Sequence, residues 1–322
     1  MKVIQVGIGG MGQAWLRAVQ QSDEVTFAGF VEINDEVAEQ VAASFGLDRT
    51  LIFKSLPEAL DAVQADGVID VTPPRFHREI SLTALEAGIP VLSEKPLADT
   101  LEAARDIVRK ADETGVLHMV AQNYRYSVPA QTLKQELASG VFGAVGSVTV
   151  EFFKGPHFGG FREEMPYPLV IDMAIHHFDM LRFLLGRDPV AVYGHSWNPS
   201  WSWFQGDASA AAVFQFEDGV TASYNGSWCS QGQETPWNGH WRFECENGVV
   251  TLRNDVVRVA GLDNPVPPVE MVHTAQSYLL HEFYQAVSSG TPPATTCQDN
   301  IHSLAMVFAL VQSFETGTEV RI

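Results

Sequence analysis

The sequence is poor in cysteine, in positive charge and in long apolar runs, and each shortage disfavours a class of protein. Its 322 residues include three cysteines, Cys229, Cys245 and Cys297. Three scattered thiols are too few for a disulfide framework or a four-thiolate zinc site. Lysine and arginine number 20 against 39 aspartates and glutamates, which gives a formal charge of −19. A surface this acidic repels phosphate backbones and anionic lipids, so we expect no role on nucleic acid or a membrane.

Apolar segments are short. Crossing a bilayer takes roughly 20 apolar residues, whereas the run from Leu304 to Val311 is only long enough to pack in a protein core. The opening residues, Met1–Val6, lead into glycines and not into the apolar stretch of a signal peptide. We therefore expect a cytoplasmic protein. The length and the 46% hydrophobic content suffice for two cores of ordinary domain size.

In the first 120 residues, strand-like and helix-like segments alternate. Helix-length segments such as 37–45, 76–87 and 101–114 separate short β-branched runs. Strict alternation predicts a parallel sheet with helices on both faces, and the handedness of the crossovers restricts it to a doubly wound α/β fold. The strand-like runs are Val3–Val6, Val25–Val31, Gly67–Val71, Val91–Ser93 and Leu117–Ala121.

After Gln122 the pattern changes. Residues 221–228 alternate as in a half-buried strand, and Asp218-Gly219 and Asn247-Gly248 suit two-residue hairpin turns. A loop rich in glycine and proline, 155–168, precedes an apolar helical stretch from about Leu169 to Leu185. These signals predict an α+β fold with an antiparallel sheet. We expect two domains, residues 1–122 and residues 123–322.

A glycine fingerprint follows the first strand and opens a helix-like stretch. The pattern G-x-G-x-x-G allows a tight turn, close approach of the backbone to a pyrophosphate, and close packing of helix on strand. The helix N-terminus offers N–H groups and partial positive charge to phosphates. These features predict a dinucleotide-binding Rossmann domain. The candidate cofactor-binding residues here are Gly7, Gly9, Gly10, Met11 and Gly12.

Glu32 stands 20 residues beyond Gly12, at the end of the second strand, where an acid can bind the ribose 2′-hydroxyl. Its carboxylate would repel a 2′-phosphate, and residues 33–36 contain no cation to hold one. The alternative is an exposed surface acid. We expect NAD as the cofactor, with NADP less favoured.

Two further segments end strands of the expected parallel sheet, where ligands bind in open α/β folds. Thr72-Pro73-Pro74 follows one strand, and taken alone it is best interpreted as a turn. Lys95 follows the next strand, where its ammonium could hydrogen-bond a substrate oxygen as charge develops there during hydride transfer. A surface lysine paired with Glu94 is the alternative, and sequence position leaves both open.

A third constellation lies in the second half. Asp172 and His176 are spaced i, i+4, and Asp179 stands three residues beyond His176, so on a helix the three share one stripe. A carboxylate one turn before an imidazole can orient it for acid–base work. Two structural alternatives are a row of hydrogen-bonded polar side chains between the domains and a set of polar side chains on an exposed helix surface. A metal site is the least favoured, because no further ligand cluster accompanies the stripe.

These segments together resemble the glucose–fructose oxidoreductase / inositol dehydrogenase / MocA-like (Gfo/Idh/MocA) family over essentially the whole chain. The resemblance implies an N-terminal Rossmann domain and a C-terminal α+β domain with a large, mostly antiparallel open sheet. It also implies reversible hydride transfer between nicotinamide and a secondary hydroxyl or keto group of a sugar, cyclitol or related polyol. The motifs that carry the resemblance are the glycine fingerprint, Thr72–His77, Glu94-Lys95-Pro96, Asn123–Tyr126 and Asp172-x-Ala174-x-His176-x-x-Asp179.

The resemblance also implies roles for individual residues. Lys95 and His176 would contact the reacting oxygen, with Asp172 orienting the substrate or His176, and which of Lys95 and His176 moves the proton stays open. Relatives commonly carry a glycine-rich stretch before the aspartate, whereas residues 165–171 here are not glycine-rich, so substrate specificity cannot be copied. Further cofactor contacts would be Thr72, Pro73, His77 and Glu94, and further substrate contacts Tyr124 and Arg125.

Six of the seven tryptophans fall between Trp197 and Trp241. Indoles stack on sugar rings, but aromatic residues also pair across strands and fill subunit interfaces. We expect Trp228 and Trp241 on a sheet face used for subunit contact, in a homodimer or homotetramer formed through the C-terminal sheet. The main hypothesis is an NAD-dependent dehydrogenase; a nicotinamide-sensing regulatory protein of the same fold without turnover is the alternative.

Overall fold

The computed structural model describes residues 1–322 and divides the chain into two compact units. Unit 1 comprises Met1–Asn123 and His273–Ile301, and unit 2 comprises Tyr124–Val272 and His302–Ile322. Residues 273–301 therefore contribute to the first unit, a return of the chain that no local sequence pattern indicates. No helix in the chain combines the length and apolarity that a membrane crossing requires.

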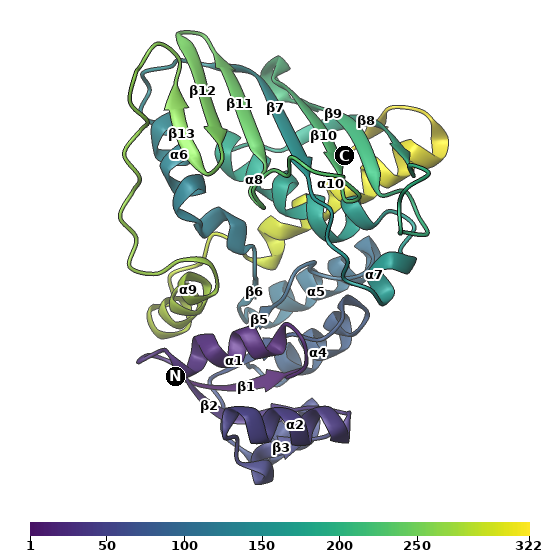
Figure 1. Ribbon diagram of the computed structural model, residues 1–322. Coiled ribbons are helices and arrows are strands. Elements are labelled where there is room, and N and C mark those ends of the chain that lie inside the picture. The colour runs from purple at the N-terminus through teal and green to yellow at the C-terminus, as the bar shows by residue number, and fades with distance from the viewer. The chain divides into compact units, whose positions relative to one another are not determined.

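Unit 1 is built on a six-stranded parallel sheet in the order β3-β2-β1-β4-β5-β6 (Figure 1). The order reverses between β1 and β4, which confirms the doubly wound fold and places a crevice beyond the carboxyl ends of these two strands. The strand β3 has only two residues and was not expected. The strands are β1 (Lys2–Val6), β2 (Thr26–Val31), β3 (Ile52–Phe53), β4 (Gly67–Asp70), β5 (Val91–Ser93) and β6 (His118–Val120).

Capping residues mark the ends of several helices of unit 1. The Asn34 side chain accepts hydrogen bonds from the N–H groups of Glu36 and Val37 at the start of α2, and Thr100 caps α5 in the same manner. Gly115 ends α5 in the left-handed conformation that glycine adopts most readily. The helices are α1 (Gly12–Gln20), α2 (Asp35–Phe45), α3 (Leu56–Ala62), α4 (Pro74–Glu86), α5 (Leu101–Thr114), α9 (Ala275–Ser289) and the start of α10 (Cys297–Thr316).

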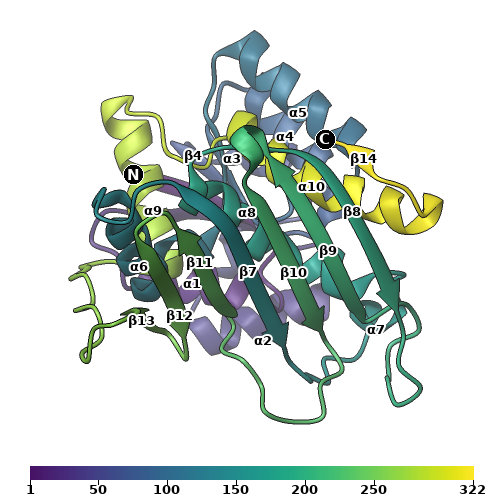
Figure 2. The same ribbon diagram turned by 90° about the horizontal axis from the view of Figure 1, so that it is seen from above.

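Unit 2 holds an eight-stranded sheet in the order β13-β12-β11-β7-β10-β9-β8-β14. Only β7 and β10 pair in parallel, which confirms the mostly antiparallel sheet. Figure 2 looks onto the face of this sheet that carries no helix, with α6 (Val128–Ala138) and α8 (Ile175–Leu185) behind it. The strands are β7 (Val145–Phe153), β8 (Pro189–Trp197), β9 (Ser209–Phe216), β10 (Thr221–Ser227), β11 (His240–Cys245), β12 (Gly248–Arg253), β13 (Val256–Val259) and β14 (Val320–Arg321).

Both expected hairpins are present, and both turns differ from the prediction by one residue. Asp218 and Gly219 have positive φ, but the Phe216 N–H bonds to the Val220 carbonyl oxygen, so Glu217, Asp218 and Gly219 form a three-residue loop between β9 and β10 and not the predicted two-residue turn. At the second turn Cys245 pairs with Gly248, so Glu246 and Asn247 form the loop and Gly248 already belongs to β12. The prediction of Asn247-Gly248 as the turn pair was therefore wrong by one residue.

The core of unit 2 lies between α8 and the sheet. Phe178 of α8 meets the rings of Phe214 and Tyr224 on β9 and β10. Trp228 and Trp241 are each 1% exposed and belong to the buried hydrophobic core. The expectation that these two tryptophans lie on a sheet face available to another subunit was wrong, because strand alternation separates two faces without saying which one a helix covers.

A histidine sits in this core without charge. Nε2 of His177 lies 3.0 Å from the Trp237 carbonyl oxygen and Nδ1 lies 3.3 Å from the Tyr224 hydroxyl. Burial lowers the pKa of His177 to about 4, against the hydrogen bond to the Trp237 carbonyl, which raises it. Since a carbonyl accepts and a hydroxyl can donate, the neutral ring satisfies both partners.

Acid should therefore destabilise the protein through His177. Its folded pKa lies below the ordinary value of about 6.5, so its stabilisation is complete above pH 6.5 and is lost as the pH falls toward 4. The full loss corresponds to about 3 kcal/mol. Urea unfolding at pH 7 and pH 4.5 should show a smaller acid-induced loss in His177→Gln than in the wild type. The same change at the exposed His195 is the matched control, and equal losses in all three proteins would contradict the assignment.

Candidate functional site

In the glycine fingerprint, the first and last glycines are closely packed against main-chain atoms, whereas the two middle glycines face open space. Gly7 has a φ of +85°, and a Cβ there would lie 2.9 Å from the Val71 carbonyl oxygen. At Gly12, the first residue of α1, a Cβ would lie 2.4 Å from the Gly7 carbonyl oxygen. Both positions exclude any side chain, because real Cβ atoms do not approach other atoms this closely. The first and last glycines are thus required by the backbone itself.

The middle glycines are not required by the protein's own packing. A Cβ at Gly9 would meet only the Val37 Cγ1 atom, at 3.7 Å, and one at Gly10 would meet nothing within 4 Å. Neither has a positive φ. No side chain caps the N-terminus of α1, whose N-cap residue is Met11. Open space over two glycines at an uncapped helix start fits the pyrophosphate of a dinucleotide.

Glu32 follows β2 and is folded back over the same turn. Its carboxylate accepts hydrogen bonds from the N–H groups of Ile8, at 3.3 Å, and Asn34, at 3.0 Å. Each carboxylate oxygen therefore has one backbone donor and keeps a lone pair for a ligand hydroxyl. This arrangement fits the ribose of an adenosine, as the sequence predicts.

A cation that the sequence analysis missed lies beside Glu32. Nζ of Lys54 donates to the Glu32 carbonyl oxygen at 3.1 Å and pairs with the exposed Asp35 carboxylate. Lys54 stands 22 residues beyond Glu32, directly after the short β3, and only the β2–β3 pairing brings it there. A preference against a 2′-phosphate therefore depends on the balance between Glu32 and Lys54.

The turn after β4 is shaped by side chains that bind main-chain atoms. The buried Asp70 carboxylate accepts from the Thr72 N–H at 3.0 Å and from its hydroxyl at 2.7 Å. His77, in the first turn of α4, places Nε2 at 2.8 Å from the Thr72 carbonyl oxygen and Nδ1 at 2.8 Å from the Pro96 carbonyl oxygen. His77 therefore touches the turns that follow β4 and β5.

The turn after β5 is tied to α1. One Glu94 carboxylate oxygen accepts from the indole N–H of Trp15 at 2.8 Å, and the other accepts from the Lys95 main-chain N–H at 3.1 Å. Burial raises the pKa of Glu94, and the Trp15 bond and the charges of Lys95 and His77 oppose that rise. Glu94 thus holds the main chain of Lys95 in register with α1, a contact with Trp15 that the sequence analysis did not foresee.

The candidate residues of unit 2 gather at the start of α8. Asp172 lies in a π-helical segment, Leu169–Ala174, that leads into α8. The ring of Tyr124 lies over that of His176 with centroids 4.2 Å apart. Burial raises the pKa of the Tyr124 phenol, and the charges of Asp172 and Asp255 add to the rise. Tyr124 therefore stays protonated at neutral pH and can donate its proton in a hydrogen bond.

Arg162, in the short helix α7 (Phe161–Glu164), donates from Nε to the Asp172 carboxylate at 2.7 Å. Its guanidinium also lies over the rings of Phe158 and Phe161. The helix just before residues 165–171 thus supplies a cation for Asp172, which the sequence analysis did not predict.

Arg125 and Asp179 form a buried ion pair. Nε and Nη2 of Arg125 bind the two carboxylate oxygens of Asp179 at 2.5 and 2.6 Å, and the Ser303 hydroxyl donates to Oδ1 at 2.7 Å. Breaking such a pair leaves an uncompensated charge in the core, so both residues support the start of α8. Asp179 is therefore held apart from the Asp172 end of the predicted stripe.

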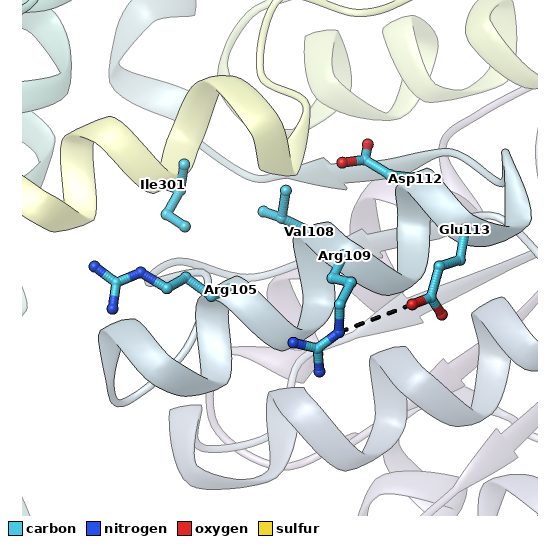
Figure 3. Close-up of a pocket in the computed structure, with 6 residues that line it drawn as sticks. All are labelled: Arg105, Val108, Arg109, Asp112, Glu113 and Ile301. Carbon is cyan, nitrogen blue, oxygen red and sulfur yellow. Dashed lines mark ion pairs between the residues drawn. The ribbon is translucent and has the colours of Figure 1, made fainter.

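No group of three or more histidine, cysteine, aspartate or glutamate side chains is placed to hold a metal ion. A depression of about 460 Å³ lies on unit 1 against α5, lined by Arg105, Val108, Arg109, Asp112, Glu113 and Ile301 (Figure 3). Its charges are paired in part, since Arg109 bonds to Asp106 and faces Glu113. It contains none of the candidate residues.

Comparison with models of protein families identifies the family of this chain. Residues 1–122 match the family described as "Oxidoreductase family, NAD-binding Rossmann fold", and residues 130–251 match the C-terminal domain of the same Gfo/Idh/MocA family. The chain belongs to the Gfo/Idh/MocA oxidoreductase family. Its N-terminal domain is an NAD-binding Rossmann domain.

Relatives in the Gfo/Idh/MocA family match nearly the whole chain. It is 26% identical to 1,5-anhydro-D-fructose reductase of Ensifer adhaerens, over 98% of this chain and 97% of the relative. It is 27% identical to scyllo-inositol 2-dehydrogenase (NAD(+)) of Bacillus subtilis, over 98% and 95%. The crystal structure of an oxidoreductase from Agrobacterium radiobacter in complex with NAD+, L-tartaric acid and magnesium superposes with a TM-score of 0.91 at 21% identity, covering 100% of this chain and 98% of that one. This last likeness shows the shared fold.

The open space at Gly9 generates a prediction. Gly9→Ala should weaken NADH binding at least about tenfold, because the methyl group occupies the position of close backbone approach. The free energy of unfolding should change by less than about 1 kcal/mol, since the backbone there suits alanine. Isothermal titration and urea unfolding measure the two quantities.

Gly12→Ala is the control, because its Cβ would lie 2.4 Å from the Gly7 carbonyl oxygen and should destabilise the fold. Wild-type affinity for NADH in Gly9→Ala would place the dinucleotide elsewhere.

Proposed function

We propose that the protein is a dehydrogenase that transfers a hydride between NAD(H) and a secondary hydroxyl or keto group of a sugar, cyclitol or related polyol. The observation that carries this proposal is the placement of Lys95 at the carboxyl end of β5, in a turn that Glu94 ties to the helix of the glycine fingerprint. The two named relatives, a sugar-derivative reductase and an inositol dehydrogenase, support the substrate class.

Residues of unit 1 hold the cofactor in this proposal. The N-terminus of α1 and the open Gly9 and Gly10 receive the pyrophosphate, and Glu32 accepts hydrogen bonds from the ribose hydroxyls. The nicotinamide of bound NAD would supply the acceptor for the hydride of the carbinol carbon. The remaining proposed cofactor contacts are Gly7, Met11, Gly12, Thr72, Pro73, His77 and Glu94.

Oxidation of a secondary alcohol also releases the hydroxyl proton, which a base must take. We assign this step to Lys95 and His176, because the family resemblance implies that both would contact the reacting oxygen. An ammonium or imidazole at that oxygen stabilises charge as the carbonyl forms or disappears. Asp172 orients the substrate or His176, and Arg162 holds Asp172 by the hydrogen bond from its Nε.

Tyr124 and Arg125 are the further proposed substrate contacts, and they differ in how far the geometry supports the role. The protonated phenol of Tyr124 packs against His176, with the two rings tilted by 35°, and can donate a hydrogen bond to a substrate oxygen. The guanidinium of Arg125 already binds Asp179 in the core, which gives it a structural role in addition.

The helix-free face of the unit 2 sheet supports a homodimer or homotetramer. Tyr193 on β8 and Val213 on β9 are 51% and 41% exposed and are directly paired across the two strands. Large apolar side chains that are exposed on a helix-free sheet face are typical of subunit contacts. Analytical ultracentrifugation of the wild type and of Val213→Lys tests this part of the proposal.

Lys95→Ala should lower kcat by at least about 100-fold while NADH still binds, the scale of a positioned acid–base group. The assay follows NADH absorbance with a panel of polyols and aldoses. The pH profile of kcat, measured for Lys95→Ala and for His176→Ala, shows which side chain carries the proton. Only the loss of the proton-carrying side chain should remove the pH dependence that its ionisation gives to kcat. Near-normal turnover of Lys95→Ala would remove the lysine from the mechanism. Wild-type protein that binds NADH without turning over any substrate would favour the nicotinamide-sensing regulator.

The balance between Glu32 and Lys54 predicts a change of cofactor choice. Glu32→Ala should raise the ratio of kcat/KM for NADP to that for NAD at least about tenfold, because the repulsion of the 2′-phosphate is removed and Lys54 remains beside the site. Adding Lys54→Gln to that variant should reverse most of the gain. An unchanged ratio in Glu32→Ala would refute the role of Glu32.

A further inference from the structure

His77 makes an unusual pair of contacts for a buried histidine. The side chain is fully buried, and its two ring nitrogens each lie 2.8 Å from a carbonyl oxygen, Nδ1 from that of Pro96 and Nε2 from that of Thr72. A carbonyl oxygen can only accept a hydrogen bond. In both contacts, therefore, a hydrogen bond forms only if the imidazole nitrogen carries a proton and donates it.

A neutral imidazole cannot meet that demand, because it carries one N–H and one lone pair. Its unprotonated nitrogen would face a carbonyl oxygen at hydrogen-bonding distance, lone pair against lone pair, at a fully buried side chain. Leaving two buried acceptors opposed in this way costs the desolvation of both groups. An imidazolium carries two N–H groups and donates to both carbonyl oxygens.

The other buried histidines show the contrast. His177 has one carbonyl and one hydroxyl partner, and His118 has the Ser81 hydroxyl at 2.9 Å from Nε2. A hydroxyl can donate as well as accept, so a neutral ring satisfies these partners. Accordingly the pKa of His118 is lowered to about 3, by burial and by the charge of His77, and that of His177 is lowered to about 4.

The charges that face His77 can balance a cation. Glu94, in the turn after β5, interacts electrostatically with His77, and that interaction stabilises the carboxylate. Asp70, at the end of β4, binds the N–H and hydroxyl of the same Thr72 whose carbonyl faces His77. Lys95 and His118 are the other titratable groups in electrostatic contact with this cluster. The Glu94 carboxylate thus interacts with the ring directly, and the Asp70 carboxylate is bonded to the residue whose carbonyl the ring contacts.

We propose that His77 is held as a doubly protonated imidazolium that ties the turn after β4 to the turn after β5, and so positions the main chain beside Lys95. Its two donated bonds join residues 72 and 96, which are far apart in sequence and flank the predicted cofactor crevice. His77 is a positioning residue, because it acts on the reaction through the Pro96 carbonyl and not by contact with substrate.

The direct test is nitrogen NMR of the histidine rings in the wild-type protein at pH 8. An ordinary histidine is neutral there. We expect His77 to show two protonated ring nitrogens, whereas His118 and His177, in the same spectrum, each show one protonated and one bare nitrogen. A bare ring nitrogen on His77 at pH 8 overturns the proposal. This result depends on the structure of unit 1 alone, so it decides the protonation state even where no turnover is found.

Two amide variants test the positioning role, which rests on the proposed function. His77→Gln places its N–H₂ near the position of Nε2 and can keep the bond to Thr72, whereas His77→Asn places it near Nδ1 and can keep the bond to Pro96. We expect His77→Gln to lower kcat at least about tenfold, the factor expected for one charge-assisted hydrogen bond, with a smaller loss in His77→Asn.

Urea unfolding of both variants shows whether they are equally destabilised. Equal loss of kcat in the two variants, at equal stability, would mean that His77 supports the fold without positioning the Lys95 turn. A variant that does not fold leaves the decision to the NMR measurement on the wild type.

Discussion

The close packing of the first turn of α1 on the glycine turn is the constraint on which the rest of unit 1 depends. Gly12 fits there only because it has no Cβ, since one would lie 2.4 Å from the Gly7 carbonyl oxygen. The helix that starts at this point points its uncapped N-terminus at the open middle glycines. One turn later the same helix carries Trp15, whose indole holds Glu94 and with it the main chain of Lys95. A single helix thus links the dinucleotide cradle to the residue proposed for the chemistry.

The main-chain bonds of the sheet continue as far as the bond from the Glu94 N–H to the Asp70 carbonyl oxygen, at 2.8 Å. Beyond it, side chains fix the turns that line the crevice. Asp70 shapes the segment at Thr72, Glu94 shapes the segment at Lys95, and His77 joins the two. Each of these bonds uses a charged or potentially charged group in a largely buried setting, where such bonds are strong and their loss is costly. The crevice can therefore be rigid although it is made of loops, and rigidity of this kind is what positions a reacting group.

Periodicity and turn chemistry were enough to predict the doubly wound sheet, the antiparallel character of the second sheet and most helix bounds, because these depend on residues close together in the sequence. The glycine fingerprint and the proposal for Lys95 rest on such local patterns too. Contacts between distant segments were not predicted: Lys54 reaches Glu32 only through the pairing of β2 with the two-residue β3, and Trp15 reaches Glu94 across 79 residues. The burial of Trp228 and Trp241 was missed because alternation does not reveal which face a helix covers. Likewise the π-helical segment that holds Asp172 shows no sequence signature.

Titration of the wild-type protein with NADH, followed by energy transfer from protein tryptophan to the bound nicotinamide and by competition with NAD, tests the central claim most directly. Trp15 lies one helical turn from the glycine turn and touches the Glu94 carboxylate, so a dinucleotide across the carboxyl end of this sheet lies within range of transfer. The account predicts a saturable signal that NAD displaces. A protein whose fluorescence is unaffected by either form of the cofactor, with no heat of binding, would contradict it.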